Sequence, residues 1–367
     1  MAFTAFGELT PFQKVNWSRT VWKAARDQMF LKNFMSDTGN SVVHRITELT
    51  ETNKGTQCLI QLVADLIGDG VRGDDEREGM EEAMDAHSQI IRIDQISHSV
   101  GNKGRFDDQK NIIDFRNQGK DKLSFWLAQR TDELAFLTMS GISYAFKNNG
   151  APRVGSVFPE LEFAADLTAP SAKRSLMWDG TSLAVSNTGS ITTGYVPKYN
   201  MIVDAIAYAK EHRIKPLMSG GKPYYVMFVA PGTLAALKKD EAYQRAVVGV
   251  AGKSGLESPW FTGATVTVDG AVIHEHTLVY NTKGAASGSK WGAGGLVNGT
   301  RTLLCGSQAL AFADIGDGHW VEKLFQYDSK IGLNIDRMIG FLKPVFPSIY
   351  DGSDEDFGLL SIDHYLQ

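Results

Sequence analysis

Cysteine is scarce in this chain, which has only Cys58 and Cys305 among its 367 residues. Both lie in apolar runs, and no C-x-x-C pair is present. The sequence therefore has neither a disulfide framework nor the usual spacing of a structural zinc site. We expect two buried core thiols.

Long apolar runs and an excess of basic charge are also lacking. No run approaches the ~18 residues of a membrane span, and the first residues lack the basic start and apolar stretch of a secretion signal. The formal net charge of −5 argues against a strongly basic nucleic-acid binder. These absences predict a protein made and used in a reducing, aqueous compartment.

The first half of the chain divides into three patterned segments. Residues 10–35 have the spacing of an amphipathic helix within a mildly basic arm. Strand-like runs at 56–64 and 88–99 enclose a glycine-rich, acidic connection, which predicts an extended hairpin. Residues 107–148 have apolar positions at helical spacing and predict a helix of roughly 60 Å.

The second half alternates between strand and helix patterns. Its expected elements are a helix at 201–210, a buried strand at 224–229 with a helix from Thr233 to about 247, a hairpin at 265–280 turning at Asp269-Gly270, a buried run at 302–313 that turns into a helix, and long strands at 318–346. The acidic segment that follows is expected to be an exposed tail.

The stretch from Gly68 to Gly73 is a literal G-x-G-x-x-G, and Asp94 follows about 20 residues later, as in a dinucleotide-binding site. Residues 65–85, however, carry nine acidic residues against two arginines, and these carboxylates would repel a diphosphate. No repeated βαβ pattern surrounds the motif. We interpret its glycines as bends at the tip of an acidic hairpin, with Asp94 in the returning strand.

Other motifs do not form a catalytic or cofactor site. The loop Gly284–Lys290 has the composition of a phosphate-binding loop but the wrong spacing. His274 and His276 share one face of a strand without further metal ligands nearby. The run Asp74-Asp75-Glu76 lacks the spacing of a calcium loop. We therefore expect no catalytic residues, no cofactor and no metal. The absence of such a site favours a structural protein whose extensions are covered by neighbouring subunits.

Five segments in register resemble one family, the major capsid proteins of N-four-like tailed phages. The best marker is "GDGVRGDDEREGMEEAMDAHSQIIRIDQISHSVGNKGRF". The others are "YYVMFVAPGTLAALKKDEAYQRA", "SPWFTGATVTVDGAVIHEH", "LLCGSQALAFADI" and "DSKIGLNIDRMIGFLK", and the resemblance covers about residues 30–345. Ser258 stands where the family usually has asparagine.

The resemblance implies an α+β chain with the Hong Kong 97-type capsid fold. The implied parts are an N-terminal arm (1–50), an E-loop hairpin (55–106), a peripheral domain (107–197 and 313–350) with its spine helix (107–148), an axial domain (198–312) and a C-terminal tail (351–367).

The function implied by the resemblance is self-assembly into the icosahedral shell that encloses a tailed phage's double-stranded DNA. The implied partners are other copies in hexamers and pentamers, portal, scaffold or decoration proteins, and packaged DNA contacted without sequence specificity, with no membrane. The implied location is the virion capsid, assembled in the host bacterial cytoplasm. The alternatives are an enzyme with a nucleotide or metal cofactor and another phage assembly protein.

We expect the acidic hairpin tip to contact a neighbouring subunit through opposite charge. Reversing its charge is expected to reduce particle yield. The candidate contact residues are Gly68, Gly70, Arg72, Gly73, Asp74, Asp75, Glu76 and Arg77 at the tip, and Lys110, Arg116, Lys120, Lys122 and Arg130 on the spine helix. Each exposed pair is worth only ~0–1 kcal/mol, so many copies would be needed for a stable shell.

Overall fold

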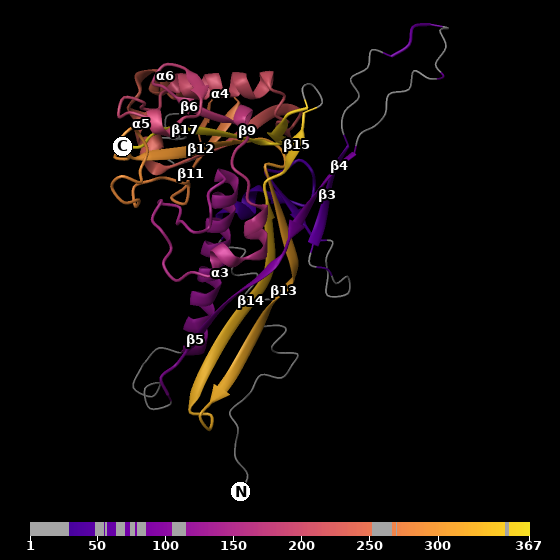
Figure 1. Ribbon diagram of the computed structural model, residues 1–367, viewed down its shortest axis with the longest axis vertical. Coiled ribbons are helices and arrows are strands. Elements are labelled where there is room, and N and C mark those ends of the chain that lie inside the picture. The colour runs from indigo at the N-terminus through magenta and orange to yellow at the C-terminus, as the bar shows by residue number, and fades with distance from the viewer. Residues whose placement is uncertain are drawn as a thin grey trace.

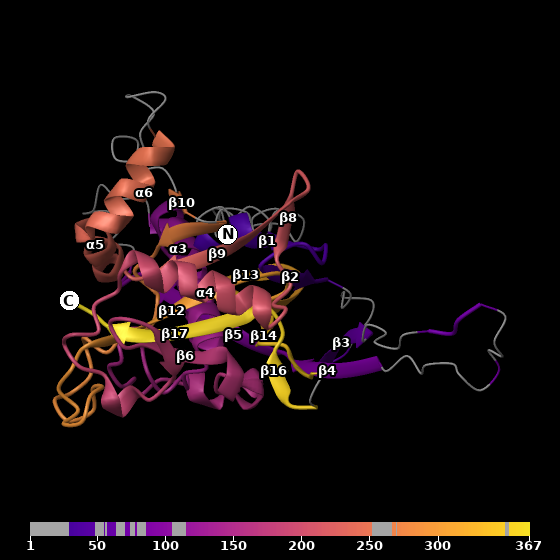
Figure 2. The same cartoon turned by 90° about the horizontal axis from the view of Figure 1, so that it is seen from above.

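A computed structural model describes residues 29–47, 55, 57–63, 70–73, 78, 86–104, 115–251, 266–268, 270–348 and 352–367. A five-stranded sheet packs beside one long helix, and an eight-stranded sheet lies across the end of that helix. Two antiparallel hairpins project from this body in different directions (Figures 1 and 2). Most of the expected arm helix at 10–35 lies outside the described residues; its last part is a short 3-10 helix, η1 (Phe30–Phe34), followed by a strand.

The long helix α3 (Phe115–Ser140) is the spine of the body. Leu123 and Leu127 are buried in the same core as Leu333 of the five-stranded sheet. A Cβ added at Gly119 would meet the Leu333 side chain at 2.6 Å, so this glycine lets helix and sheet pack closely. The final turns are buried on all sides, where the Thr131 and Thr138 hydroxyls donate to backbone carbonyls one turn earlier.

The expected helix end at residue 148 is wrong, because α3 stops at Ser140. Gly141 adopts a left-handed conformation (φ +64°). Its N–H bonds the carbonyl of Thr138, and the N–H of Ile142 bonds that of Leu137, which is the Schellman pattern of a helix end. At 26 residues the described helix is about 39 Å long, not 60 Å.

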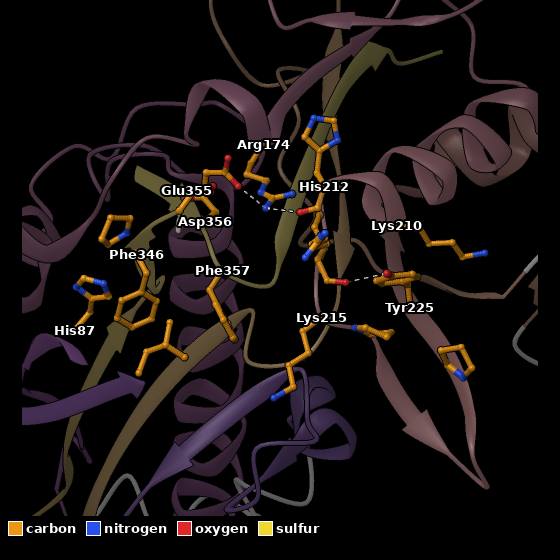
Figure 3. Close-up of a pocket in the computed structure, with 17 residues that line it drawn as sticks. His87, Arg174, Lys210, His212, Lys215, Tyr225, Phe346, Glu355, Asp356 and Phe357 are labelled. Atoms are coloured by element: carbon orange, nitrogen blue, oxygen red, sulfur yellow. Dashed lines mark hydrogen bonds and ion pairs between the residues drawn. The ribbon is translucent and has the colours of Figure 1, made fainter. Parts of the chain in front are cut away.

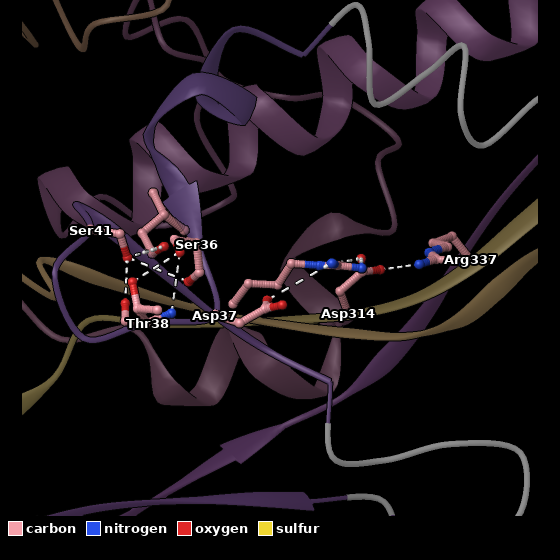
Figure 4. A network of polar contacts seen from close by, with 8 residues as sticks. Ser36, Asp37, Thr38, Ser41, Asp314 and Arg337 are labelled. Atoms are coloured by element: carbon pink, nitrogen blue, oxygen red, sulfur yellow. Dashed lines mark hydrogen bonds and ion pairs between the residues drawn. The ribbon is translucent and has the colours of Figure 1, made fainter.

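The five-stranded sheet has the order β1 (Met35–Ser36), β2 (Val43–Ile46), β13 (Leu310–Phe325), β14 (Lys330–Leu342) and β5 (Asp94–Gly101). The chain's early segment is tied to this sheet by charge. Buried Asp314 accepts from Arg45 (2.8 Å to Nη2) and also pairs with buried Arg337 (Figure 4).

The eight-stranded sheet has the order β10-β11-β9-β12-β17-β6-β7, with β8 added on β9. The bounds are β6 (Ser175–Trp178), β7 (Leu183–Val185), β8 (Leu217–Ser219), β9 (Lys222–Val229), β10 (Val266–Val268), β11 (Ala271–Glu275), β12 (Gly299–Cys305) and β17 (Leu359–Tyr365). The helices α4 (Tyr199–Glu211), α5 (Pro231–Lys239) and α6 (Glu241–Ala251) cover one face, and the end of α3 lies on the other (Figure 1).

The acidic segment that was expected to be exposed is exposed only in part, and the residues that follow it form β17, which lies in the middle of this sheet between β12 and β6. Its residues from Leu359 to His364 are all buried. Likewise β6 and β7 pair in this sheet, although their segment was assigned to the peripheral domain. The acidic residues before Leu359 suggested solvent, but Asp356 is buried against Lys343 at 2.9 Å.

Two expected helices differ from the structure. Residues 302–313 form the end of β12, a turn and the start of β13 instead of a helix. Alternate side chains of β13 face two different cores, as in a strand: Phe312 is buried in the core that contains α3, while Ala311 and Ala313 are buried in the small core beneath the β3–β4 hairpin. The helix expected from Thr233 to about 247 begins at Pro231 and breaks at Asp240, whose backbone is extended and whose carboxylate accepts the N–H of Tyr199 (2.7 Å).

The remaining elements are short. Strands β15 (Val345–Pro347) and β16 (Asp354–Asp356) form a separate pair, as do β3 and β4, described below. The 3-10 helices are η2 (Phe158–Glu160), η3 (Glu162–Asp166), η4 (Ala172–Arg174) and η5 (Thr188–Ser190).

Candidate subunit-contact site

The predicted extended hairpin is confirmed as β3 (Gln57–Val63) and β4 (Ala86–Arg92). The strands are antiparallel, with register from Gln57–Arg92 to Val63–Ala86. An antiparallel partner excludes the parallel βαβ unit that a dinucleotide site requires. The hairpin projects from the body and carries the glycine-rich segment at its far end (Figure 1).

One face of the hairpin anchors it to the body. Cys58 and Ile91 are opposite each other and share a small core with Ile46, Ala311 and Leu342.

A side-chain amide adds a polar anchor two residues farther along this face. The Gln89 amide accepts from the Val345 N–H (3.0 Å) and donates to the Val345 carbonyl, so it mimics one step of a strand pair. The base of the hairpin is therefore fixed.

The opposite face of the hairpin is exposed and carries one apolar pair among polar side chains. Leu59 and Ile90 are direct cross-strand partners, and they are 47% and 50% exposed. Two large aliphatic side chains together on a projecting two-stranded ribbon are a surface that a protein partner would cover, because such ribbons are marginally stable alone.

At the tip, Gly70 and Gly73 have φ values of +75° and +59°, which glycine adopts without strain. A Cβ built on either has no atom within 4 Å, and Arg72 is exposed. The two glycines therefore serve the backbone conformation of the tip rather than close packing. The other tip candidates, Gly68, Asp74, Asp75, Glu76 and Arg77, lie outside the described residues.

The predicted basic partners on the spine helix differ in availability. Arg116 pairs with Glu322 at 2.6 Å, and Arg130 pairs with Glu133. Lys120 is half-buried and Lys122 is exposed, while Lys110 lies outside the described residues. Two of the five candidates thus already neutralise carboxylates of their own chain.

Asp94 is a structural residue at the corner between the hairpin and the five-stranded sheet. It begins β5, and its Oδ2 accepts the N–H of Glu162 at 2.9 Å. Arg92, two residues earlier, pairs with Asp166 at 2.6 Å. The strand predicted over 88–99 is thus two strands: the hairpin's returning strand β4 ends at Arg92, and Asp94 begins β5 of the five-stranded sheet.

The histidine pair packs among aromatic rings. His276 stacks on Phe30 (4.1 Å between centroids) and Phe136 (5.2 Å), and His274 meets Phe34 edge-on at 4.7 Å. The described residues contain no group of three or more His, Cys, Asp or Glu side chains placed to hold a metal. The histidines instead dock the early chain segment on the body.

Acid should weaken this packing. Burial lowers the pKa of His276 from 6.5 to about 4, so the folded protein keeps the ring neutral while the unfolded chain protonates it. Its contribution is fully present above pH 6.5 and is lost as the pH falls from 6.5 towards 4. We expect His276→Phe, measured by thermal unfolding of the unassembled subunit, to lose less Tm between pH 7 and 4.5 than the wild type. Equal losses would contradict this assignment.

Two features of the structure were not predicted. Asp132, buried in the spine helix, accepts the N–H groups of Phe30 (2.8 Å) and Leu31, and burial raises its pKa to about 6. The β13–β14 hairpin ends in an exposed turn, where Tyr327 is fully exposed. Asp132 is not one of the apolar positions that mark the buried side of the helix in the sequence, so nothing in the sequence indicated that this carboxylate is buried and accepts backbone hydrogen bonds.

None of the helices described is long and apolar enough to cross a membrane.

Comparisons with known proteins agree with this architecture. A family model described as phage capsid protein matches residues 6–367. The major capsid protein of Pseudomonas phage KPP25 is 47% identical over 365 residues, which cover 98% of this chain and 97% of that protein. The capsid of Ralstonia phage GP4 superposes with a TM-score of 0.78 at 25% identity, covering 100% of this chain and 98% of that chain. The cyanophage Pam1 capsid gives 0.71 at 18% identity, with 99% of both chains covered.

The expected Hong Kong 97-type fold is confirmed by these structural neighbours. The family match and the 47% identity both extend over nearly the whole chain. This chain belongs to the phage capsid protein family.

Proposed function

We propose that this protein is the major subunit of an icosahedral shell that encloses the double-stranded DNA of a tailed phage. The observation that carries the proposal is the β3–β4 hairpin, which is anchored at its base and leaves Leu59 and Ile90 exposed on a projecting ribbon. In a monomer the projecting ribbon leaves these two apolar side chains in water, whereas a neighbouring copy would bury them. The near full-length likeness to a major capsid protein supports the same function.

The parts of the chain take roles that follow the two sheets. Residues 1–50 act as an arm, and 55–106 as the E-loop that reaches a neighbour. The five-stranded sheet and α3 form the peripheral domain. The eight-stranded sheet forms the axial domain, to which we now assign β6, β7 and residues 351–367 as well.

The partners follow from the shell. Hexamers and pentamers of this chain form the surface, assembled in the host bacterial cytoplasm, with portal, scaffold or decoration proteins at specialised positions. Packaged DNA contacts the inner face without sequence specificity, which suits a chain of net charge −5. The role requires no catalysis. An enzyme with a nucleotide or metal cofactor remains the alternative of a different class, and equilibrium nucleotide binding to the subunit tests it.

Electron microscopy of the overexpressed protein tests the proposal directly. Shells, tubes or capsomers are expected. Monodisperse small particles under all salt conditions would contradict it, and another assembly role would then be the better reading.

The shell should be held together without covalent links through the hairpin. Some proteins with this type of fold cross-link through a loop lysine, but the hairpin has no lysine between Gly55 and Asn102. Particles boiled in denaturant are expected to run as monomers on a gel. A ladder of multimers would show that another donor is used.

A further inference from the structure

A cavity of about 670 Å³ opens where three parts of the chain meet. Leu62 and His87, a cross-strand pair of the β3–β4 hairpin, form one wall. Phe346 of β15 and Phe357, which follows β16, form the second, and the loop 212–216 after α4 forms the third. The volume lies within the roughly 300–1,000 Å³ that small-molecule sites occupy.

One side of the cavity is apolar. Phe346 and Phe357 pack edge to face, with 5.9 Å between ring centroids. Pro216, Pro223 and Pro347 are also in the lining, and their rings present carbon surface without a backbone N–H donor. This surface suits an aromatic or branched apolar group.

A buried guanidinium in the lining has an unused edge. Arg174, at the end of η4, is 5% exposed, and its Nη2 donates to the His212 carbonyl (3.0 Å) and to Glu355 (2.5 Å). Its Nε and Nη1 have no hydrogen-bond partner within the part of the chain that the structure describes. Because guanidinium N–H groups lie in a planar fork that matches two oxygens, this edge is a group that a phosphate or carboxylate would satisfy.

The carboxylates of the lining do not supply that acceptor. Glu355 is already bound to Nη2 of Arg174, and Asp356 pairs with buried Lys343 at 2.9 Å. Lys215 also lines the cavity, its side chain is exposed, and it pairs with no carboxylate of the described residues. Positive charge that an anion could neutralise therefore remains in the lining.

The charged and apolar parts of the lining are arranged around one space. Figure 3 shows His87, Phe346 and Phe357 towards one side of the cavity, with Arg174 above them and Lys215 below. A molecule that lies against the two phenylalanine rings can therefore turn an oxyanion towards Arg174 and still feel the charge of Lys215.

We propose that this cavity binds a small organic anion, in which a phosphate or carboxylate group is attached to an aromatic or branched apolar body. Arg174 takes the oxyanion through its unused edge, Lys215 adds positive charge, and the two phenylalanines hold the apolar body. Because the walls come from the hairpin, from β15 and β16 and from the loop after α4, the bound molecule links these three parts. The site does not depend on the proposed shell function.

Ligand-observed saturation-transfer NMR on the purified protein measures the binding, in free subunits or in particles. Phenyl phosphate and benzoate are the probes and distinguish the two oxyanions. Benzyl alcohol supplies the ring without the charge, and inorganic phosphate competes without the ring. We expect at least one of the two anions to bind ten-fold more tightly than benzyl alcohol, and inorganic phosphate to displace it only at ten-fold higher concentration. Equal affinity for benzyl alcohol, or no saturable binding of either anion, would overturn the proposal.

Variants locate the site. Lys215→Met changes an exposed side chain, and Phe357→Leu keeps an apolar one; each is expected to weaken binding of the anion at least five-fold. Lys147→Met is the matched control, because Lys147 is exposed and lies outside the cavity lining, and it should leave the affinity unchanged.

Arg174→Lys keeps the charge but removes the planar edge, so it should abolish the preference for the anion over benzyl alcohol. If this variant does not fold, Lys215→Met and Phe357→Leu decide the matter. Unchanged affinity in both would place the anion elsewhere on the protein and overturn the proposal. Assembly does not enter these measurements, so the anion site and the shell function stand or fall separately.

Discussion

Replacing Asp363 with asparagine is expected to destabilise the unassembled subunit by about 3–5 kcal/mol. Asp363 is fully buried on β17 and accepts from Arg301 of β12 through two bonds, 2.7 Å from Nε and 2.9 Å from Nη2. The same guanidinium donates to the carbonyl of Ser140 at 2.6 Å, where the spine helix ends. The substitution leaves a buried guanidinium without its counter-charge at the junction of the sheet and the helix.

Urea unfolding of the subunit, followed by tryptophan fluorescence, measures the loss. The matched control is Glu241→Gln, which removes the exposed i,i+4 partner of Arg245 and should cost less than about 0.5 kcal/mol. The double variant Arg301→Met with Asp363→Leu should recover most of the stability, because it removes both buried charges. A loss below about 1 kcal/mol in Asp363→Asn would show that the pair is not essential.

This ion pair also shows what the sequence could not predict. Arg301 and Asp363 are 62 residues apart, and nothing local marks either as buried. The acidic run before Leu359 favoured an exposed tail, yet β17 pairs with β12 along its whole length. Pairing between distant strands depends on the whole core, so local charge was a poor guide.

Local signals did better. Alternation at 88–99 and the acidic connection predicted the hairpin, and Asp269-Gly270 predicted the β10–β11 turn, because strand period and turn chemistry are short-range properties. Apolar spacing found α3 but missed its end at Gly141, where a Cβ would clash with Thr168 and Pro170, a tertiary contact that local spacing does not show.

The candidate contact site was predicted only in part, because local sequence shows charge but not contacts between distant segments. The tip's charge is readable in sequence, whereas its partners are not: Arg116 pairs with Glu322, 206 residues away.

Assembly should be most sensitive to the exposed apolar pair of the hairpin. We expect Ile90→Asp to reduce particle yield at least ten-fold while the subunit stays folded. Ile90 is 50% exposed and faces Leu59, so a carboxylate there is solvated in the free subunit. In the shell the same carboxylate would lose water beside apolar groups without a partner, which costs several kcal/mol at every hairpin.

Sedimentation and electron microscopy measure the yield, and thermal unfolding checks the fold. Ile90→Val is the matched control, because it keeps an apolar side chain and should assemble nearly as well as the wild type. Val185→Asp, on the exposed strand β7, tests whether an added charge at any exposed apolar position has the same effect. Normal assembly of Ile90→Asp would mean that this face of the hairpin stays in solvent in the shell. The ribbon would then contact other subunits only through its inner face and its tip.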